Sequence, residues 1–164
     1  MDFSNLISNL LSKKLVTART ADGTTYGPAE SLVTHTPITY GSLPGAGYAG
    51  DFNPQTNTIK IDPSKGNVSQ ITKHEQVHAL LNRLPNAGVA QTQSAPGYQD
   101  IATRLNGTVQ GNLPDEVPAY MAQSPTSQTY GVSDAQRNAY MQGLVGQLQK
   151  LDPTIAAKLQ RLSQ

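Results

Sequence analysis

The chain has 164 residues, and 12 Lys and Arg residues against 11 Asp and Glu residues give it a net charge of +1. This near-neutral balance excludes the strongly basic surface of a dedicated nucleic-acid-binding protein, so we expect no nucleic-acid partner. The absence of cysteine excludes disulfides, thiolate metal ligands and a cysteine nucleophile. No stretch approaches about 18 consecutive apolar residues, and the first residues do not resemble a secretory signal. We therefore expect no membrane span and favour a cytoplasmic or virion-associated location.

The length is typical of one domain, and we expect residues 1–164 to form it. Residues 1–16 carry apolar side chains at helical spacing, which predicts an N-terminal amphipathic helix. Residues 17–66 have the short β-branched runs typical of strands, whereas residues 67–123 and 124–164 return to helical spacing. Strands followed by helices favour an α+β fold, with a short, twisted, mostly antiparallel sheet and flanking N- and C-terminal helices.

The β-rich part contains three short β-branched segments that Gly, Pro and Asn residues separate. We predict strands at Thr24–Tyr26, Ser31–Thr36 and Thr58–Ile61. The last of these follows Gly47–Asp51 and the turn-rich Asn53–Asn57, and this order predicts a hairpin.

The helical part of the sequence contains start and stop signals. We predict helices over Val68–Arg83 and Asp115–Gln123, and a long surface loop over the Gln-, Asn- and Gly-rich Pro85–Gly97. One or two helices are expected between Ser133 and Gln164, where Asp152-Pro153 interrupts a broad apolar face. This face either packs on the preceding helices or mediates self-association or assembly with a partner, because the remaining surface is polar but weakly charged.

The most informative motif is H-E-x-x-H, formed by His74, Glu75 and His78. On a helix the two histidines are one turn apart on the same face, so both imidazoles can bind one cation. Asn67 or Ser69 can cap this helix. The pattern therefore predicts a metal site, with the Glu75 carboxylate next to a metal-bound water.

This motif resembles the zinc-binding helix of the zincin metallopeptidases. The metzincin extension requires a third histidine, but no histidine follows His78, so that branch is excluded. Glu116 lies in Glu116-Val117-Pro118-Ala119, which resembles the E-x-x-A signature of the gluzincins, and the short chain is similar to minimal members of that group. The resemblance implies one zinc ion bound by His74, His78 and Glu116.

One feature departs from the gluzincin pattern. Pro118 lies two residues after Glu116, and proline is tolerated in the first helical turn, so we expect the helix to start near Asp115. In that position Glu116 either binds the metal or complements the helix dipole. Asp100 is the alternative third ligand.

The resemblance also implies roles for side chains around the metal. Glu75 would act as general base and acid, taking a proton from water and passing it to the leaving amine. A tyrosine would stabilise the oxyanion, and we consider Tyr120 and Tyr130 first. The tyrosines downstream of the motif are Tyr98, Tyr120, Tyr130 and Tyr140. The polar residues suited to hold the imidazole N–H groups are Asn82, Asn112 and Asp115.

The predicted strand Thr58–Ile61 precedes the motif helix, where zincins keep the edge strand that aligns the substrate. Its alternation, with Ile59 and Ile61 on one face, fits any half-buried strand. Under the zincin interpretation, its free backbone groups pair with an extended peptide or protein substrate.

We therefore expect a zinc-dependent endopeptidase. One alternative is a non-catalytic module of a larger assembly, such as a virion, in which zinc stabilises the fold. Another is a metal hydrolase that cleaves cell-wall cross-links rather than ordinary peptides. All three interpretations share the zinc site and differ in what, if anything, is hydrolysed there.

Overall fold

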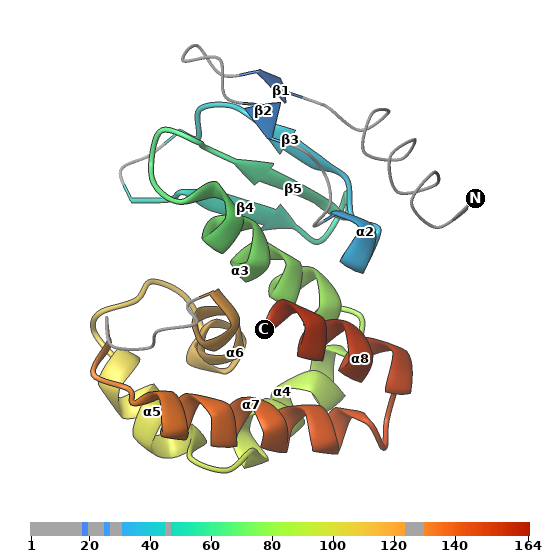
Figure 1. The fold of residues 1–164 in the computed structure, drawn as a ribbon, viewed down its shortest axis with the longest axis vertical. Helices are drawn as coiled ribbons and strands as arrows, with labels where there is room; N and C mark the ends of the chain where they lie inside the picture. Colours follow the sequence, from blue (N-terminus) through green and yellow to red (C-terminus); the bar gives the residue numbers. More distant parts are fainter. Residues whose placement is uncertain (1–17, 20–24, 27–30, 45–46, 124–129) are drawn as a thin grey trace, which may run out of the picture.

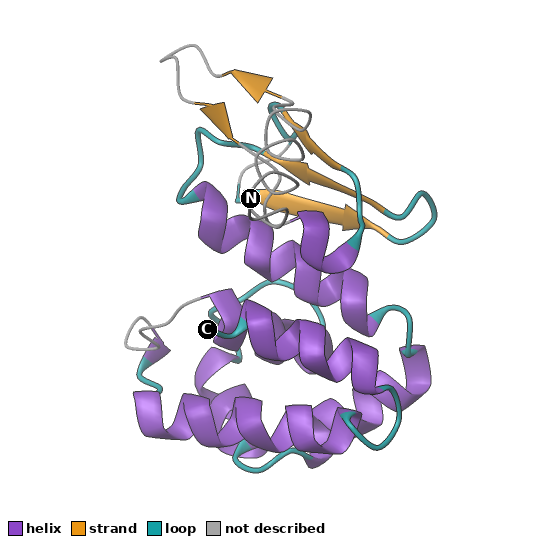
Figure 2. Cartoon of the chain, turned by 45° about the vertical axis from the view of Figure 1, so that its right-hand side comes forward, coloured by secondary structure: helices purple, strands orange, loops and turns teal. Residues whose placement is uncertain are grey.

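The computed structural model describes residues 18–19, 25–26, 31–44, 47–123 and 130–164. In these residues the strands precede the longer helices, which confirms the predicted α+β fold. A small sheet covers one side of the helix α3 (Val68–Leu81), and the helices that follow pack on its other side (Figure 1, Figure 2). The helix predicted in residues 1–16 lies outside the described residues.

Three strands form the main sheet of the described residues, in the order β3-β5-β4 (Figure 1). They are β3 (Ile38–Tyr40), β4 (Gly50–Asn53) and β5 (Thr58–Ile61). β4 and β5 are antiparallel, with Phe52 opposite Ile59, whereas β3 and β5 are parallel. The sheet is therefore mixed rather than uniformly antiparallel.

The hairpin between β4 and β5 is confirmed, and Asn53 stabilises its turn. The side-chain oxygen of Asn53 accepts hydrogen bonds from the backbone N–H groups of Gln55 and Thr56 at 2.9 and 3.1 Å. Such an Asx turn reverses the chain direction locally. A second antiparallel pair joins β1 (Ala18–Arg19) to β2 (Thr25–Tyr26), and β2 lies within the first predicted strand.

The prediction of a strand at Ser31–Thr36 was wrong, because this segment begins with the short helix α2 (Ser31–Thr34). The guanidinium of Arg83 donates a 2.6 Å hydrogen bond to the backbone carbonyl of Thr34 and so satisfies the C-terminal end of α2. α2 also contacts α3 and the C-terminal helix α8 (Pro153–Leu162). These tertiary contacts outweigh the β propensity of the local residues.

The prediction that Thr58–Ile61 is an edge strand was also wrong. This strand, β5, lies in the centre of the sheet between β3 and β4, and Ile59 and Ile61 are fully buried. The local pattern reveals the hairpin with β4, but it carries no signal for a parallel partner at Ile38–Tyr40. Among the described strands, β4 is instead the edge strand that lies against α3.

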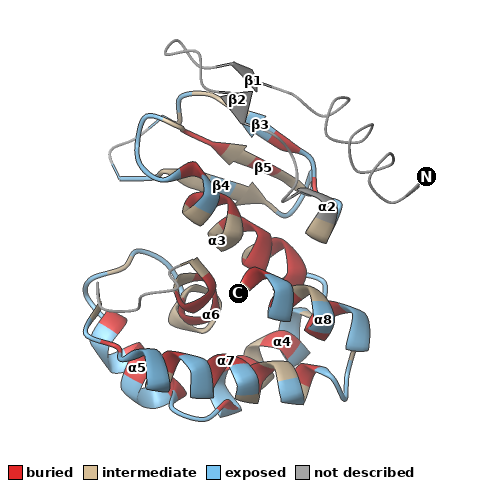
Figure 3. Ribbon diagram, viewed as in Figure 1, coloured by how far each residue is buried: buried red, intermediate tan, exposed pale blue. Residues whose placement is uncertain are grey.

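The helix α3 begins after Asn67, one of the two predicted N-caps, whose side-chain oxygen accepts a 3.1 Å hydrogen bond from the backbone N–H of Gln70. It ends at Leu81, close to the predicted end. α3 is buried on two sides and contributes to two separate hydrophobic clusters (Figure 3). Its side chains under the sheet are Val68, Ile71 and Ala79, and those among the helices are Val77, Leu80 and Leu81. Burial on both sides fixes the rotation of α3 and hence the direction of its polar side chains.

The prediction of a surface loop over Pro85–Gly97 was wrong, because most of this segment forms the helix α4 (Pro85–Ser94). Pro85 occupies the first turn, where its missing N–H is not needed. The buried Gly88 allows α4 to approach the C-terminal end of α3 closely, since a Cβ at that position would lie 3.2 Å from the Leu81 carbonyl oxygen. Packing on α3 thus makes a helix of a segment whose composition is typical of loops.

The helix α6 (Leu113–Gln123) starts two residues before the predicted Asp115. The carbonyl oxygen of Asn112 accepts hydrogen bonds from the backbone N–H groups of Asp115 and Glu116 at 2.9 and 3.0 Å. Glu116 is therefore held in the first turn, as predicted, and Pro118 lies inside the helix.

The remaining helices are α5 (Tyr98–Leu105), α7 (Asp134–Leu148) and α8 (Pro153–Leu162). The predicted break at Asp152-Pro153 separates α7 from α8, and Asp152 caps α8, whereas α5 was not predicted. The apolar side chains of α7 and α8 are buried in the core of the chain itself, and association with a partner through these helices stays a prediction. None of the helices in the described ranges combines the length and the apolar character needed to cross a membrane.

Candidate metal centre

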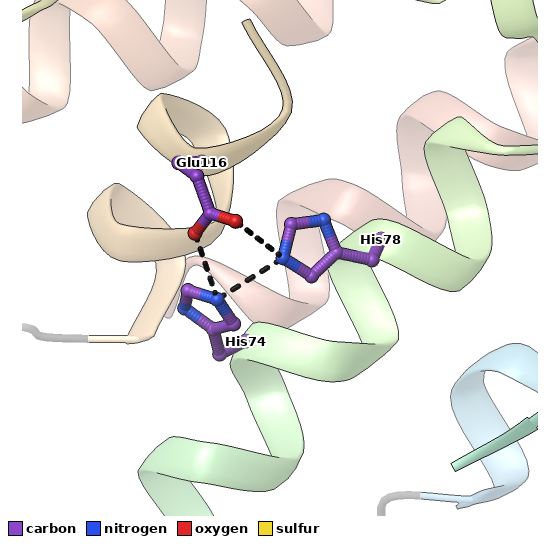
Figure 4. Close-up of side chains that lie close together, drawn as sticks. All are labelled: His74, His78 and Glu116. Atoms are coloured by element: carbon purple, nitrogen blue, oxygen red, sulfur yellow. Dashed lines mark hydrogen bonds and ion pairs between the residues drawn. The ribbon is translucent and has the colours of Figure 1, made fainter. Parts of the chain in front are cut away.

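Three side chains from α3 and α6 converge at one point (Figure 4). His74 and His78 lie one turn apart on α3, and Glu116 faces them from the first turn of α6. The two Nε2 atoms are 3.0 Å apart. The carboxylate oxygens of Glu116 lie 3.2 Å from Nε2 of His74 and 3.7 Å from Nε2 of His78. The structure thus brings together the three residues that the sequence singles out as metal ligands.

The side chains of this cluster lie close enough together to bind one metal ion such as zinc. With bonds of about 2.0 to 2.1 Å from zinc to nitrogen or oxygen, two donors at a tetrahedral ion are about 3.3 Å apart. The two imidazole nitrogens are 3.0 Å apart, and each lies near a different oxygen of Glu116, Oε2 at 3.2 Å from His74 and Oε1 at 3.7 Å from His78. Two imidazoles and one carboxylate are also a donor set of catalytic zinc sites, which keep one coordination position for water or substrate. The residues therefore fit zinc, whose binding stays a prediction.

The alternative third ligand, Asp100, does not belong to this cluster. It lies on α5, where its side chain is 51% exposed. Its carboxylate accepts hydrogen bonds from Nε of Arg104 at 3.3 Å and from Nε2 of Gln136 at 2.7 Å. Of the two carboxylates considered from the sequence, Glu116 is the one that the fold directs to the histidines.

A hydrogen bond that the sequence did not suggest orients His74. Its Nδ1 lies 3.0 Å from Oε1 of Gln123, and because an amide oxygen only accepts, Nδ1 carries the hydrogen and Nε2 keeps its lone pair. Of the partners considered from the sequence, Asn112 instead donates to Asp115 at 3.1 Å. The sequence contains a signal for this contact, because Gln123 follows Glu116 by two helical turns and therefore lies on the same face of α6.

The imidazole of His78 is held in its neutral form. Burial lowers the pKa of His78 to about 4, and the neighbouring His74 acts in the same direction. Glu116 opposes this shift without reversing it. Near neutral pH His78 therefore keeps the lone pair that a metal ligand needs.

Glu75 lies next to the ligand cluster but outside it. Its side chain is packed against the edge strand β4, where a Cβ at Gly50 would come within 2.5 Å of the carboxylate oxygen Oε1. The backbone N–H of Phe52 also hydrogen-bonds to the carboxylate. Burial raises the pKa of Glu75 to about 7. Such a group gains and loses its proton near neutral pH, as suits a general base.

Of the four tyrosines considered from the sequence, Tyr120 is the one that lines the cleft at this centre. Its ring packs edge-on against His74, with ring centroids 4.6 Å apart. Tyr130 packs edge-on against Tyr120 at 5.0 Å, whereas Tyr98 and Tyr140 are buried in the helical core. Burial raises the pKa of Tyr120 to about 12, so its hydroxyl stays protonated.

The centre opens into a cleft of about 720 Å³. Residues 47–52, which include most of β4, line it together with residues of α4 such as Asn86 and Val89. His74, Glu75, His78 and Glu116 are part of the same lining. The proposed metal ligands are therefore reachable from solvent, and the edge strand runs beside them.

Comparison of the chain with protein-family models, with curated proteins and with solved structures finds no match. The likeness to zincins therefore rests on the two short motifs, and the interpretation of the site rests on its geometry.

Proposed function

We propose that this protein is a zinc-dependent endopeptidase of the gluzincin type. The observation that supports this best is the cluster of His74, His78 and Glu116, whose donor atoms have zinc-like separations and line an open cleft. Structural zinc sites are closed by four protein ligands, whereas three ligands with an open side are typical of catalytic sites. The buried carboxylate of Glu75 adjoins the cluster without being a ligand.

The residues of the centre have distinct roles in the proposed reaction. His74, His78 and Glu116 would hold a zinc ion, which when bound would supply Lewis-acid polarisation of the scissile carbonyl and activation of a water molecule. Glu75 would take a proton from the water molecule that attacks the carbonyl carbon and pass it to the amine nitrogen as the C–N bond breaks.

Tyr120 is the proposed donor to the oxyanion. Its phenol is protonated at physiological pH, and its ring lies beside His74 in the lining of the cleft. A neutral phenol there can donate a hydrogen bond to the carbonyl oxygen as that oxygen becomes negative. Tyr130 contacts the ring of Tyr120 and acts through it as a positioning residue.

The peptide substrate is proposed to pair with β4 rather than with β5. Among the described strands, β4 has no partner on its outer side, and its residues line the cleft. An extended peptide added there pairs with the outward-facing backbone groups of β4 other than the N–H of Phe52, which is already bonded to Glu75. Such a peptide passes close to Glu75, because that carboxylate lies against Gly50 of β4.

A comparison of the wild-type protein with Glu75→Gln tests this proposal. Glutamine has the size of glutamate but cannot accept the proton, so hydrolysis of a mixed peptide pool should fall by roughly 10²- to 10⁴-fold while zinc stays bound. His78→Gln is the matched control and should lose both zinc and hydrolysis. Cleavage is followed by mass spectrometry, with and without a zinc chelator.

Two added measurements, thermal unfolding with and without zinc and incubation with isolated peptidoglycan, distinguish the alternative functions. Bound zinc and a zinc-dependent melting temperature, without hydrolysis of any peptide, would point to a structural role in an assembly. Hydrolysis of isolated peptidoglycan but not of the peptide pool would point to a cell-wall cross-link as substrate. Full peptide hydrolysis by Glu75→Gln would contradict the proposed mechanism.

A further inference from the structure

We propose that Gly111 is a positioning residue for Glu116, because the lack of a side chain at position 111 leaves room for the carboxylate to face the two histidines. The importance of this contact for metal binding rests on the proposed function. The contact itself is a property of the protein without metal.

Gly111 lies in the segment between α5 and α6 and has a φ of +116°, a conformation that residues with a side chain rarely adopt. A Cβ at this position would collide with Oε1 of Glu116 and lie 2.9 Å from Cδ and 3.0 Å from Cγ. Carbon atoms in favourable contact are about 3.5 to 4.0 Å apart. A side chain at position 111 therefore displaces the distal half of Glu116, not only its outermost oxygen.

Glu116 has little freedom to accommodate this displacement and still face the histidines. Its backbone N–H is bonded to the carbonyl of Asn112 at 3.0 Å, which fixes where the side chain leaves α6. Its carboxylate oxygens lie 3.2 Å from Nε2 of His74 and 3.7 Å from Nε2 of His78. If a Cβ at position 111 displaces the side chain of Glu116, its carboxylate no longer keeps these distances to the two histidines. The cluster then loses the arrangement that suits zinc.

Gly107, in the same segment, offers a matched control. It also has a positive φ, +78°, but a Cβ there would have no atom within 4 Å. Alanine at position 107 therefore introduces backbone strain alone, whereas alanine at position 111 introduces strain and the collision with Glu116.

The first test compares metal binding by the wild type, Gly111→Ala and Gly107→Ala. Zn²⁺ affinity is measured by competition with a chromophoric chelator, and the ligand geometry by the visible absorption of the Co²⁺-substituted protein. We expect Gly111→Ala to bind Zn²⁺ at least about tenfold more weakly and to have an altered Co²⁺ spectrum. Gly107→Ala should behave as the wild type does. Wild-type affinity in Gly111→Ala, or an equal loss in both variants, would overturn the proposal.

A second test needs no metal and separates this proposal from the proposed function. Gly111→Ala is combined with Glu116→Ala, and melting temperatures of the metal-free proteins are compared in a double-mutant cycle. Gly111→Ala should lower the melting temperature less when residue 116 is alanine, whereas the effect of Gly107→Ala should be the same in both backgrounds. If Gly111→Ala alone does not fold, recovery of folding in the double variant supports the same conclusion.

The two tests together give an unambiguous result. If the wild type retains neither Zn²⁺ nor Co²⁺, the proposed function fails, and the cycle still decides whether Gly111 positions Glu116. Equal decreases in melting temperature in both backgrounds would overturn the positioning role.

Discussion

Nδ1 of His74 on α3 and Oε1 of Gln123 on α6 are 3.0 Å apart, and this contact sets the tautomer of one proposed zinc ligand. Gln123 is the last residue of α6, and Glu116 lies in its first turn. One face of α6 therefore supplies a ligand at one end and orients a second ligand at the other. The packing of α6 on α3 is what assembles the centre.

We predict that Gln123→Leu weakens zinc binding by about 10- to 100-fold, because Nδ1 of His74 loses the acceptor that keeps the lone pair on Nε2. The affinity is measured by competition with a chelator at constant pH. Gln123→Glu retains an acceptor oxygen and is the control that should bind zinc at least as tightly as the wild type. Identical affinities for the leucine variant and the wild type would remove any role for this hydrogen bond.

The parts of the site that the sequence predicts are those with a local signal. Asn67 and the H-E-x-x-H spacing are contained in one helix, so the position of α3 and the shared face of His74 and His78 can be predicted from helical geometry. The β4–β5 hairpin is likewise local, because Asn53 forms its turn through neighbouring backbone groups.

The parts that the sequence did not predict depend on contacts between distant segments. The central position of β5 follows from parallel pairing with β3, for which Thr58–Ile61 carries no signal of its own. The helix α4 forms where Gly88 packs against α3, although its composition resembles that of a loop. The sequence favours Glu116 and leaves Asp100 open as third ligand, whereas the position of Glu116 beside the histidines and the contact of Gln123 with His74 depend on the packing of α6 on α3.

Gly50→Ala should destabilise the protein and disturb Glu75. A Cβ at this position would lie 2.5 Å from Oε1 of Glu75 and 2.7 Å from Cγ2 of Ile71, so the edge strand must move. We expect a loss of about 1 to 3 kcal/mol in the free energy of unfolding, measured by urea denaturation. Gly41→Ala is the control, because its nearest neighbour would be the flexible Lys60 side chain at 3.7 Å, and its effect should stay within about 0.5 kcal/mol. Equal effects at the two positions would refute this account of Gly50.

Two glycines of α7 should respond to alanine in opposite directions. A Cβ at Gly143 would collide with the ring of Pro96, whereas a Cβ at Gly146 would meet no atom within 4 Å. Gly143→Ala should therefore destabilise the protein by about 1 to 3 kcal/mol. Gly146→Ala should stabilise it by up to about 1 kcal/mol, because alanine favours the helix. Chemical denaturation of both variants measures the difference, and a neutral or stabilising effect of Gly143→Ala would contradict the packing of α7 on Pro96.

Asp62 should contribute stability that depends on pH. The Ser64 hydroxyl, 2.6 Å from its carboxylate, and the backbone N–H of Leu43 at 3.1 Å hold the pKa of Asp62 below its usual value of 3.8. A lowered pKa in the folded state means that the charged form stabilises the protein above about pH 4 and that this contribution is lost as the pH falls through the folded-state pKa.

Asp62→Asn should therefore lower the melting temperature at pH 7, and the difference from the wild type should shrink as the pH falls below about 4. Thermal unfolding of both proteins between about pH 7 and pH 3 measures this. A difference that does not change with pH would mean that the charge of Asp62 contributes nothing to the loop before α3.

The most direct test of the central claim is the zinc content of the purified protein after reconstitution and removal of excess metal. We expect one zinc ion per chain in the wild type and in Glu75→Gln, and none in His78→Gln or Glu116→Ala. A wild-type protein without zinc, or a His78→Gln variant with a full complement of it, would contradict the assignment of His74, His78 and Glu116 as a zinc site.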